Sequence, residues 1–220
     1  MSPDQESTSR AQSLDEALDH YKRNVGDELD RIFDEATIQA AKTKTRERKD
    51  GPRLEITNYG RIGQMILPPG WTEAQQPAGE TDKRRFREFT PPDKPNVKIC
   101  FFFRGHRVAD EVAKAFQAVL EKPAHVVTSA EFAAVAEVVR DKTPSDTFKL
   151  LVAATRDVNQ KRVLLVEGTY SESNDDVHAL HIDGDGAGSI IQEVYFQAPK
   201  KEYPLHFAEV STAFKSIQWK

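Results

Sequence analysis

Residues 97–103 (Val-Lys-Ile-Cys-Phe-Phe-Phe) are the stretch that most constrains the fold of this chain. From Ile99 to Phe103 the residues are apolar without interruption. A strand that faces water on one side alternates between apolar and polar residues, whereas a strand covered on both sides does not. The stretch therefore predicts a central strand with further layers on both faces of its sheet, and it places Cys100 in the core.

A second strand and a closing helix are predicted at the end of the chain. Residues 190–196 read as a buried strand, and a helix is expected from about Pro204 to Trp219. The helix carries an apolar stripe with steps of three and four residues, which is the spacing of one helix face. Its members are Tyr203, Phe207, Val210, Phe214 and Ile217. Such a helix seals the core of the sheet that precedes it.

Two helices and a hairpin are expected between these strands. Thr128 and Glu131 have the spacing of a capping box, which predicts the start of the second helix. Residues 148–158 and 162–170 are strand-like and flank Asn159-Gln160, which predicts a hairpin. Residues 171–186 then hold five acids and no Lys or Arg. The predicted fold is α+β, a three-layer α/β/α sandwich with a mainly antiparallel sheet of about six strands.

The chain before this domain has a different character. Residues 1–12 are polar and predict a disordered tail. Residues 13–49 predict a long amphipathic helix, capped by Ser13 and Glu16, and a basic hinge. The folded domain is expected from residue 53 to residue 220. The apolar positions of the helix recur at steps of three and four: Leu14, Leu18, Tyr21, Val25, Leu29 and Ile32.

This apolar stripe has two interpretations. It can pack in cis across the domain, or in trans against a copy of itself in a homodimer, as surface helices commonly do. It can also serve as a docking arm whose stripe binds another protein. The basic hinge is interpreted as a solvated linker, because no aromatic residue lies among its charges to stack on nucleic-acid bases.

Composition excludes several classes of function. The net charge is −4, which gives no support for nucleic-acid binding. The single cysteine excludes an intramolecular disulfide and a Cys-only metal site. No apolar run is long enough to span a membrane, and the acidic start lacks the pattern of a secretory signal. We therefore expect a cytoplasmic protein that does not bind membranes.

The motifs of catalysis and metal binding are absent from the sequence. Counted as an EF-hand loop from Asp183, position twelve is Val194 where a bidentate Glu is needed, so a Gly-rich hairpin turn is expected instead. His178 and His181 fall on opposite faces of a strand and are interpreted as surface or hairpin histidines. No nucleophile elbow, Walker loop or zinc-protease motif is present, so neither catalytic residues nor a cofactor is predicted.

One basic cluster is a candidate anion site. Arg104, His106 and Arg107 follow the central strand, where the end of a sheet often forms a binding site. The alternative is an ordinary solvated loop.

Several short motifs resemble a known superfamily. They are the turn Leu67-Pro68-Pro69-Gly70-Trp71, the stretch from Glu193 through Ala198-Pro199, and the ending Phe214-Lys215-Ser216-Ile217. They resemble the α/β/α sandwich superfamily of PsbP, the DcrB lipoproteins and the Ran-binding nuclear-import factor, over about residues 62–219. The resemblance implies a sheet with helices on both faces and a role in binding or assembly in place of catalysis.

These observations favour a non-enzymatic, protein-binding adaptor or chaperone-like protein of unknown partner. The residues expected to bind the partner are those of the N-terminal stripe. The alternative is a small-molecule or anion-binding domain that uses Arg104, His106 and Arg107. An enzyme of unidentified type is the least favoured class.

Overall fold

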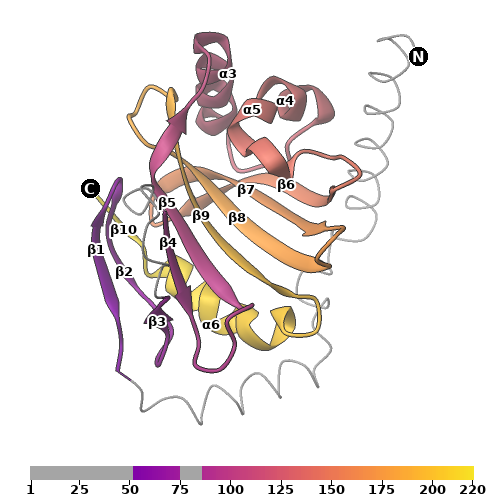
Figure 1. Cartoon of the computed structure of the whole chain (residues 1–220). Helices are drawn as coiled ribbons and strands as arrows, with labels where there is room; N and C mark the ends of the chain where they lie inside the picture. Colours follow the sequence, from indigo (N-terminus) through magenta and orange to yellow (C-terminus); the bar gives the residue numbers. More distant parts are fainter. Residues whose placement is uncertain (1–51, 75–85) are drawn as a thin grey trace, which may run out of the picture.

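The computed structural model describes residues 52–74 and 86–220, and these form an α+β fold around a seven-stranded antiparallel sheet (Figure 1). The order of the sheet is β3-β4-β5-β9-β8-β7-β6. Its strands are β3 Thr72–Glu73, β4 Phe86–Thr90, β5 Lys98–Arg107, β6 Phe148–Val158, β7 Lys161–Tyr170, β8 Asp175–Asp183 and β9 Ile190–Pro199. A smaller sheet has the order β1-β2-β10, with β1 Glu55–Tyr59, β2 Ile62–Ile66 and β10 Gln218–Trp219.

The two stretches that were predicted as buried strands lie side by side at the centre of the large sheet. β5 pairs with β9 so that Phe101 is opposite Val194 and Cys100 is opposite Tyr195. Phe101 faces one side of the sheet and Cys100 the other, and both are buried. The prediction that this strand is covered on both faces is therefore confirmed.

One face of the large sheet is covered by helix α6 (Tyr203–Lys215) and by the small sheet (Figure 1). Val210 and Phe214 of α6 share a core cluster with Trp71 and with Phe89 of β4. Phe207 packs against the same cluster. The apolar stripe of the closing helix therefore seals the core as expected.

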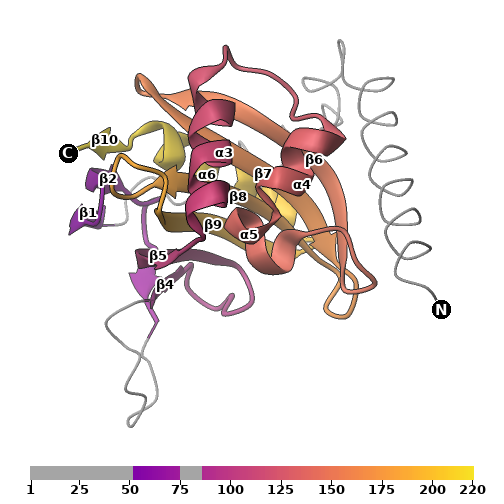
Figure 2. The same cartoon turned by 90° about the horizontal axis from the view of Figure 1, so that it is seen from above.

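The other face is covered by α3 (Asp110–Glu121), α4 (Ser129–Ala134), α5 (Ala136–Val139) and the 3-10 turn η1 (Arg140–Lys142) (Figure 2). Phe116 of α3 and Val138 of α5 are buried against the sheet in a second core cluster. The capping box predicted at the second helix is present, because the Thr128 hydroxyl accepts from the Glu131 N–H while the Glu131 carboxylate accepts from the Thr128 N–H.

Two differences from the expected elements have local causes. The closing helix ends at Lys215, not Trp219, because the Asn159 side-chain amide donates to the carbonyl oxygens of Lys215 and Ile217 and the chain then pairs as β10. The sheet has seven strands instead of about six. β8 lies within the acid-rich stretch and is apolar on both faces at its centre, with Val177 and Ala179 in one core cluster and Leu180 and Ile182 in the other.

The predicted hairpin between β6 and β7 is confirmed. Asn159 and Gln160 have φ values of 44° and 69°, as the two central residues of a tight hairpin turn require. Within the described residues, no helix is long and apolar enough to cross a membrane. The tail, the amphipathic helix and the basic hinge predicted for residues 1–49 lie outside the described residues.

Candidate functional site

A buried cluster of charged side chains lies between the sheet and the helices α3–α5. Its members are Lys142 of η1, His181 of β8 and Glu193 of β9, which are 2%, 1% and 7% exposed. We call these three residues the buried cluster. Fully buried ionisable side chains are rare in proteins and cost free energy unless they are paired, so this cluster is a candidate functional site.

The two sheet residues of the buried cluster are brought together by strand register. His181 lies directly opposite Glu193 in the β8–β9 pair. Glu193 lies between Ile191 and Tyr195 on the face of β9 that packs under the helices. Lys142 reaches them from above because α5 ends at Val139 and η1 turns the chain back towards the sheet.

The contacts within the buried cluster are close but incomplete. The Lys142 Nζ lies 2.7 Å from the Glu193 Oε1, and the His181 Nε2 lies 3.6 Å from the same oxygen. Lys142 is thus the ion-pair partner of this oxygen, and no other described side chain donates to it. Lys142 also contacts Asp141 Oδ1 at 3.2 Å.

Several polar atoms around the buried cluster have no hydrogen-bond partner among the residues that the structure describes. They are both ring nitrogens of His181, Oε1 of Glu193 and Nδ1 of the neighbouring His106. Buried polar atoms in native proteins nearly always have a partner, which can be ordered water or a ligand. The cluster is therefore a place where a small polar molecule could be bound.

Burial and charge set the protonation states of the buried cluster. Burial opposes the charged form of Lys142, but Glu193, Tyr170 and Asp141 outweigh it, so the pKa of Lys142 lies above its ordinary value. Burial lowers the pKa of His181 to about 4, although Glu193 opposes this effect. At neutral pH the cluster thus holds a lysine cation and a neutral imidazole beside Glu193.

Cys100 and Tyr195 lie opposite each other in the β5–β9 pair, on the same sheet face as the buried cluster. Burial and the Glu88 carboxylate raise the pKa of the Cys100 thiol. A thiol that holds its proton is a poor nucleophile. Cys100 is 0% exposed, so its predicted place in the core is confirmed.

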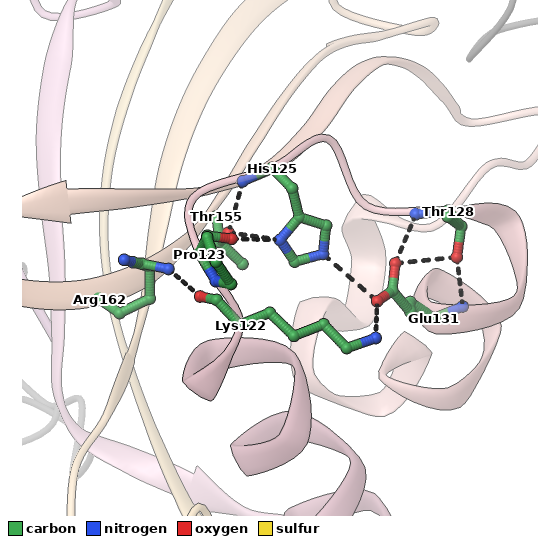
Figure 3. Close-up of polar contacts among 7 residues, drawn as sticks. All are labelled: Lys122, Pro123, His125, Thr128, Glu131, Thr155 and Arg162. Carbon is green, nitrogen blue, oxygen red and sulfur yellow. Dashed lines mark hydrogen bonds and ion pairs between the residues drawn. The ribbon is translucent and has the colours of Figure 1, made fainter.

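A second polar network fastens the loop between α3 and α4 to the edge of the sheet (Figure 3). His125 Nε2 lies 3.3 Å and Lys122 Nζ 2.6 Å from Glu131 Oε1. His125 Nδ1 lies 3.1 Å from the Thr155 hydroxyl and 2.8 Å from the carbonyl oxygen of Pro123. Burial acts to raise the pKa of Glu131, but Lys122 and Thr128 outweigh it and hold this pKa at about 2.

This network contains a hydroxyl, an imidazole and a carboxylate, as hydrolytic triads do, but its groups are already engaged. The Thr155 hydroxyl accepts from the backbone N–H of His125, and Thr155 is 2% exposed. Glu131 closes the capping box of α4. A nucleophile must be open to a substrate, so the arrangement fits a structural clasp. We call Lys122, His125, Glu131 and Thr155 the clasp.

The clasp protects the edge strand β6. The Val127 N–H donates to the carbonyl oxygen of Ala153 at 2.9 Å. The Thr155 N–H donates to the carbonyl oxygen of His125 at 2.8 Å. Residues 125–127 therefore pair with the middle of β6, which leaves less of this edge available for association with another strand.

The residues predicted from sequence to bind an anion do not converge. Arg104 and Arg107 are exposed, whereas His106 is partly buried with its Nε2 3.2 Å from the Glu137 carbonyl oxygen. His106 and Arg107 are opposite Ile191 and Ile190 of β9, so they point to opposite faces of the sheet. Only His106 borders the buried cluster. The residues predicted to bind a partner, Leu14 to Ile32, lie outside the described residues.

The histidines of β8 are not surface residues as expected. They do lie on opposite faces, but His181 is 1% exposed and His178 contacts the Glu167 carboxylate at 2.6 Å beneath Phe207. The sequence interpretation also missed Lys142 and Glu193. An acid between apolar residues in the strand from Ile190 was a usable signal for Glu193, whereas Lys142 lies in a polar loop sequence that gives none.

The Gly-rich turn predicted between β8 and β9 is present. Asp183 Oδ1 accepts from the backbone N–H groups of Asp185, Gly186 and Gly188, which leaves this carboxylate occupied. In the part of the chain that the structure describes, no three His, Cys, Asp or Glu side chains could together hold a metal ion.

Comparisons with known proteins concern the fold. No protein-family model matches the chain, and no curated protein sequence matches it. Among solved structures, it is similar to cyanobacterial PsbP (CyanoP) from Synechocystis sp. PCC 6803, with 9% identity, a TM-score of 0.44, and coverage of 77% of this chain and 92% of that one. It is also similar to the Ran-binding protein Mog1p of Saccharomyces cerevisiae, with 12% identity, a TM-score of 0.43, and coverage of 77% and 96%.

A third similar structure comes from Bacteroides thetaiotaomicron VPI-5482, with 13% identity, a TM-score of 0.40, and coverage of 77% of this chain and 48% of that one. PsbP and the Ran-binding factor are also the proteins that the sequence motifs resemble, and the likeness concerns the fold alone. It carries no information about function.

Replacement of Lys142 by Met should destabilise the protein by about 3–5 kcal/mol, because it leaves the Glu193 carboxylate buried without its cation. The double variant K142M/E193M should recover at least about half of this loss, because no charge is then left uncompensated. Urea unfolding followed by circular dichroism measures both. Equal losses in the single and double variants would contradict the assignment of a coupled pair.

The depressed pKa of His181 predicts a specific pH dependence of stability. As the pH falls below 6.5, His181 binds a proton in the unfolded chain, whereas in the folded chain it does so only near pH 4. The free energy of unfolding therefore decreases as the pH is lowered through this window. Between pH 7 and pH 5 this contribution amounts to about 2 kcal/mol. The H181Q variant should lose that much less stability than the wild type over the same interval. Parallel pH profiles for the two proteins would refute the prediction.

Proposed function

We propose that this chain is a non-enzymatic, protein-binding adaptor whose N-terminal apolar stripe contacts the partner. The observation that carries the proposal is how described elements close the core of the domain. Both faces of the large sheet are covered by described elements, namely α6 with the small sheet on one side and α3–α5 on the other. The proposal assigns the stripe, which lies outside the described residues, to contact with a partner.

The sequence of the stripe supports this role. Six apolar residues from Leu14 to Ile32 recur at helical spacing, and acids are frequent between them. An amphipathic segment of this kind binds a partner by laying its apolar face into a groove. The basic hinge of residues 42–53 would separate the segment from the rigid domain.

The ionisable side chains of the domain also favour binding over catalysis. The Lys142–Glu193 pair lies under the helices, and the clasp uses its own hydroxyl, imidazole and carboxylate to hold a loop. A catalytic group needs access to its substrate as well as a suitable pKa. These groups are bound to one another.

The proposal predicts that aspartates within the stripe abolish partner binding. The L18D/L29D variant should lose a partner that the wild type captures from native extract, because two charges interrupt its apolar face. The matched control H20D/R23D places aspartates on the opposite side of the same predicted helix and should retain the partner. Direct binding of the identified, purified partner, measured by calorimetry, then gives the affinities.

Both variants should keep the thermal unfolding midpoint of the wild type to within about 2 °C, since surface substitutions rarely change stability much. Equal binding by L18D/L29D and the wild type would remove the stripe from the interface. Loss of binding by the control as well would show that charge, not the apolar face, carries the contact.

A second candidate function is the binding of a small polar molecule at the buried cluster. It is favoured by the unpartnered atoms of His181, Glu193 and His106. A thermal-shift screen with nucleotides, inorganic phosphate, small carboxylic acids and metal salts should then yield a stabilising compound whose effect disappears in H181Q. A screen without any stabilising compound would count against this function and leave the adaptor proposal untouched.

A further inference from the structure

The face of β6 on the side of α6 presents a strip of apolar residues between two bases. We call Lys149, Leu151, Val152, Ala154 and Arg156 the β6 strip. Strand register defines its face, since Ala154 is opposite Leu165 and Arg156 is opposite Val163, and both partners belong to the core cluster beneath α6. Lys149, opposite Thr169, lies on the same face, and Leu151 is the extra residue of a bulge.

The apolar part of the strip is separate from both main core clusters. Val152 and Ala154 form a small cluster of their own, with Val126 packed against them. They are 6% and 4% exposed, and Val126 is their apolar partner among the described residues. Leu151 beside them is 50% exposed, the most exposed large apolar side chain of the described domain. Leu151 is therefore the exposed apolar side chain of the strip that a further apolar element could cover.

The clasp holds one side of this surface in place. Val126 pairs with Ala154 as an isolated bridge and so faces the same side of the sheet. Its neighbour His125 is tied to Thr155 and Glu131 on the opposite side (Figure 3). The network that looks like a triad thus fixes the edge of the β6 strip.

The charges of the strip indicate what can cover it. Lys149 and Arg156 are exposed at its two ends. Glu167 lies on the same face, but its carboxylate is bound to His178. A complementary element would be apolar along its middle and acidic along its flanks.

Residues 13–36 of this chain have that composition. They carry the apolar stripe from Leu14 to Ile32, with eight acidic residues against three Lys or Arg. As a helix the 24 residues would span about 36 Å, and the eleven residues of β6 also span about 36 Å. Residues 37–51 supply up to about 50 Å of connecting chain, enough to cross the sheet from Pro52.

We propose that residues 13–36 dock in cis on the β6 strip, with their apolar stripe over Leu151, Val152 and Ala154 and their acids beside Lys149 and Arg156. A partner that takes the stripe must then displace it from its own domain. The docking itself does not rest on the adaptor function, because it is intramolecular and can be measured without any partner.

Disulfide trapping in the intact chain tests which residues meet. The V25C/L151C variant should form an intramolecular disulfide under mild oxidation, because Val25 is at the centre of the stripe. The matched control D27C/L151C places its thiol on the opposite side of the segment and should form far less. Native Cys100 is buried and does not compete. Non-reducing electrophoresis separates the cross-linked monomer from disulfide-linked dimers.

Charge reversal tests the electrostatic part without touching the core. In the full chain, hydrogen exchange of residues 13–36 should be slowed at least about tenfold relative to an unstructured peptide, as docking protects amides. The K149E/R156E variant should lose most of this protection. The control K114E/K200E makes the same charge change at two exposed lysines away from the strip and should keep it.

The outcomes separate the alternatives. A cross-linked monomer together with loss of protection in K149E/R156E supports docking in cis. Disulfide-linked dimers at low protein concentration would show that the occupant is a second copy and would overturn the proposal. Unprotected amides in the wild type, or equal trapping of V25C and D27C, would overturn it too.

Discussion

The pairing of β5 with β9 is the constraint on which the rest of the structure depends. Both strands carry apolar side chains on their two faces, so the sheet that they centre cannot leave either face in water. This requirement places α6 and the small sheet on one side and α3–α5 on the other. As a result, the Lys142–Glu193 pair is buried between the sheet and its covering helices. There the neighbour of Glu193 is set by the register of β8 and β9, which places His181 opposite it.

Local patterns were sufficient to predict the elements that fold by local rules. The uninterrupted apolar run at Phe101, the capping box at Thr128 and the turn at Asn159 each have a short-range physical cause, and each prediction is confirmed. The end of α6 was wrong because Asn159, distant in sequence, binds the last carbonyl groups of the helix. A strand was expected at His178 and His181, but the bounds of β8 were not predicted, because its acids resemble a loop until β7 and β9 are paired on either side.

The buried cluster could not be predicted for the same reason. His181 and Glu193 are twelve residues apart and meet only through the register of β8 and β9, while Lys142 comes from a loop over the sheet. The functional proposals follow from this contrast. The buried cluster is enclosed, whereas the sequence from Leu14 to Ile32 carries an apolar stripe. In our proposal the stripe docks on the β6 strip of its own domain, and a partner that binds the stripe displaces it.

Methyl nuclear Overhauser effects in the intact, monomeric chain test this account most directly. With Ala, Leu and Val methyl groups labelled, the account predicts cross-peaks between the strip methyls of Val152 or Ala154 and the stripe methyls of Leu18, Val25 or Leu29. Removal of residues 1–50 should then shift the strip methyl signals while leaving those of Val194 unchanged. An absence of such cross-peaks, together with identical strip signals in the two proteins, would contradict the account.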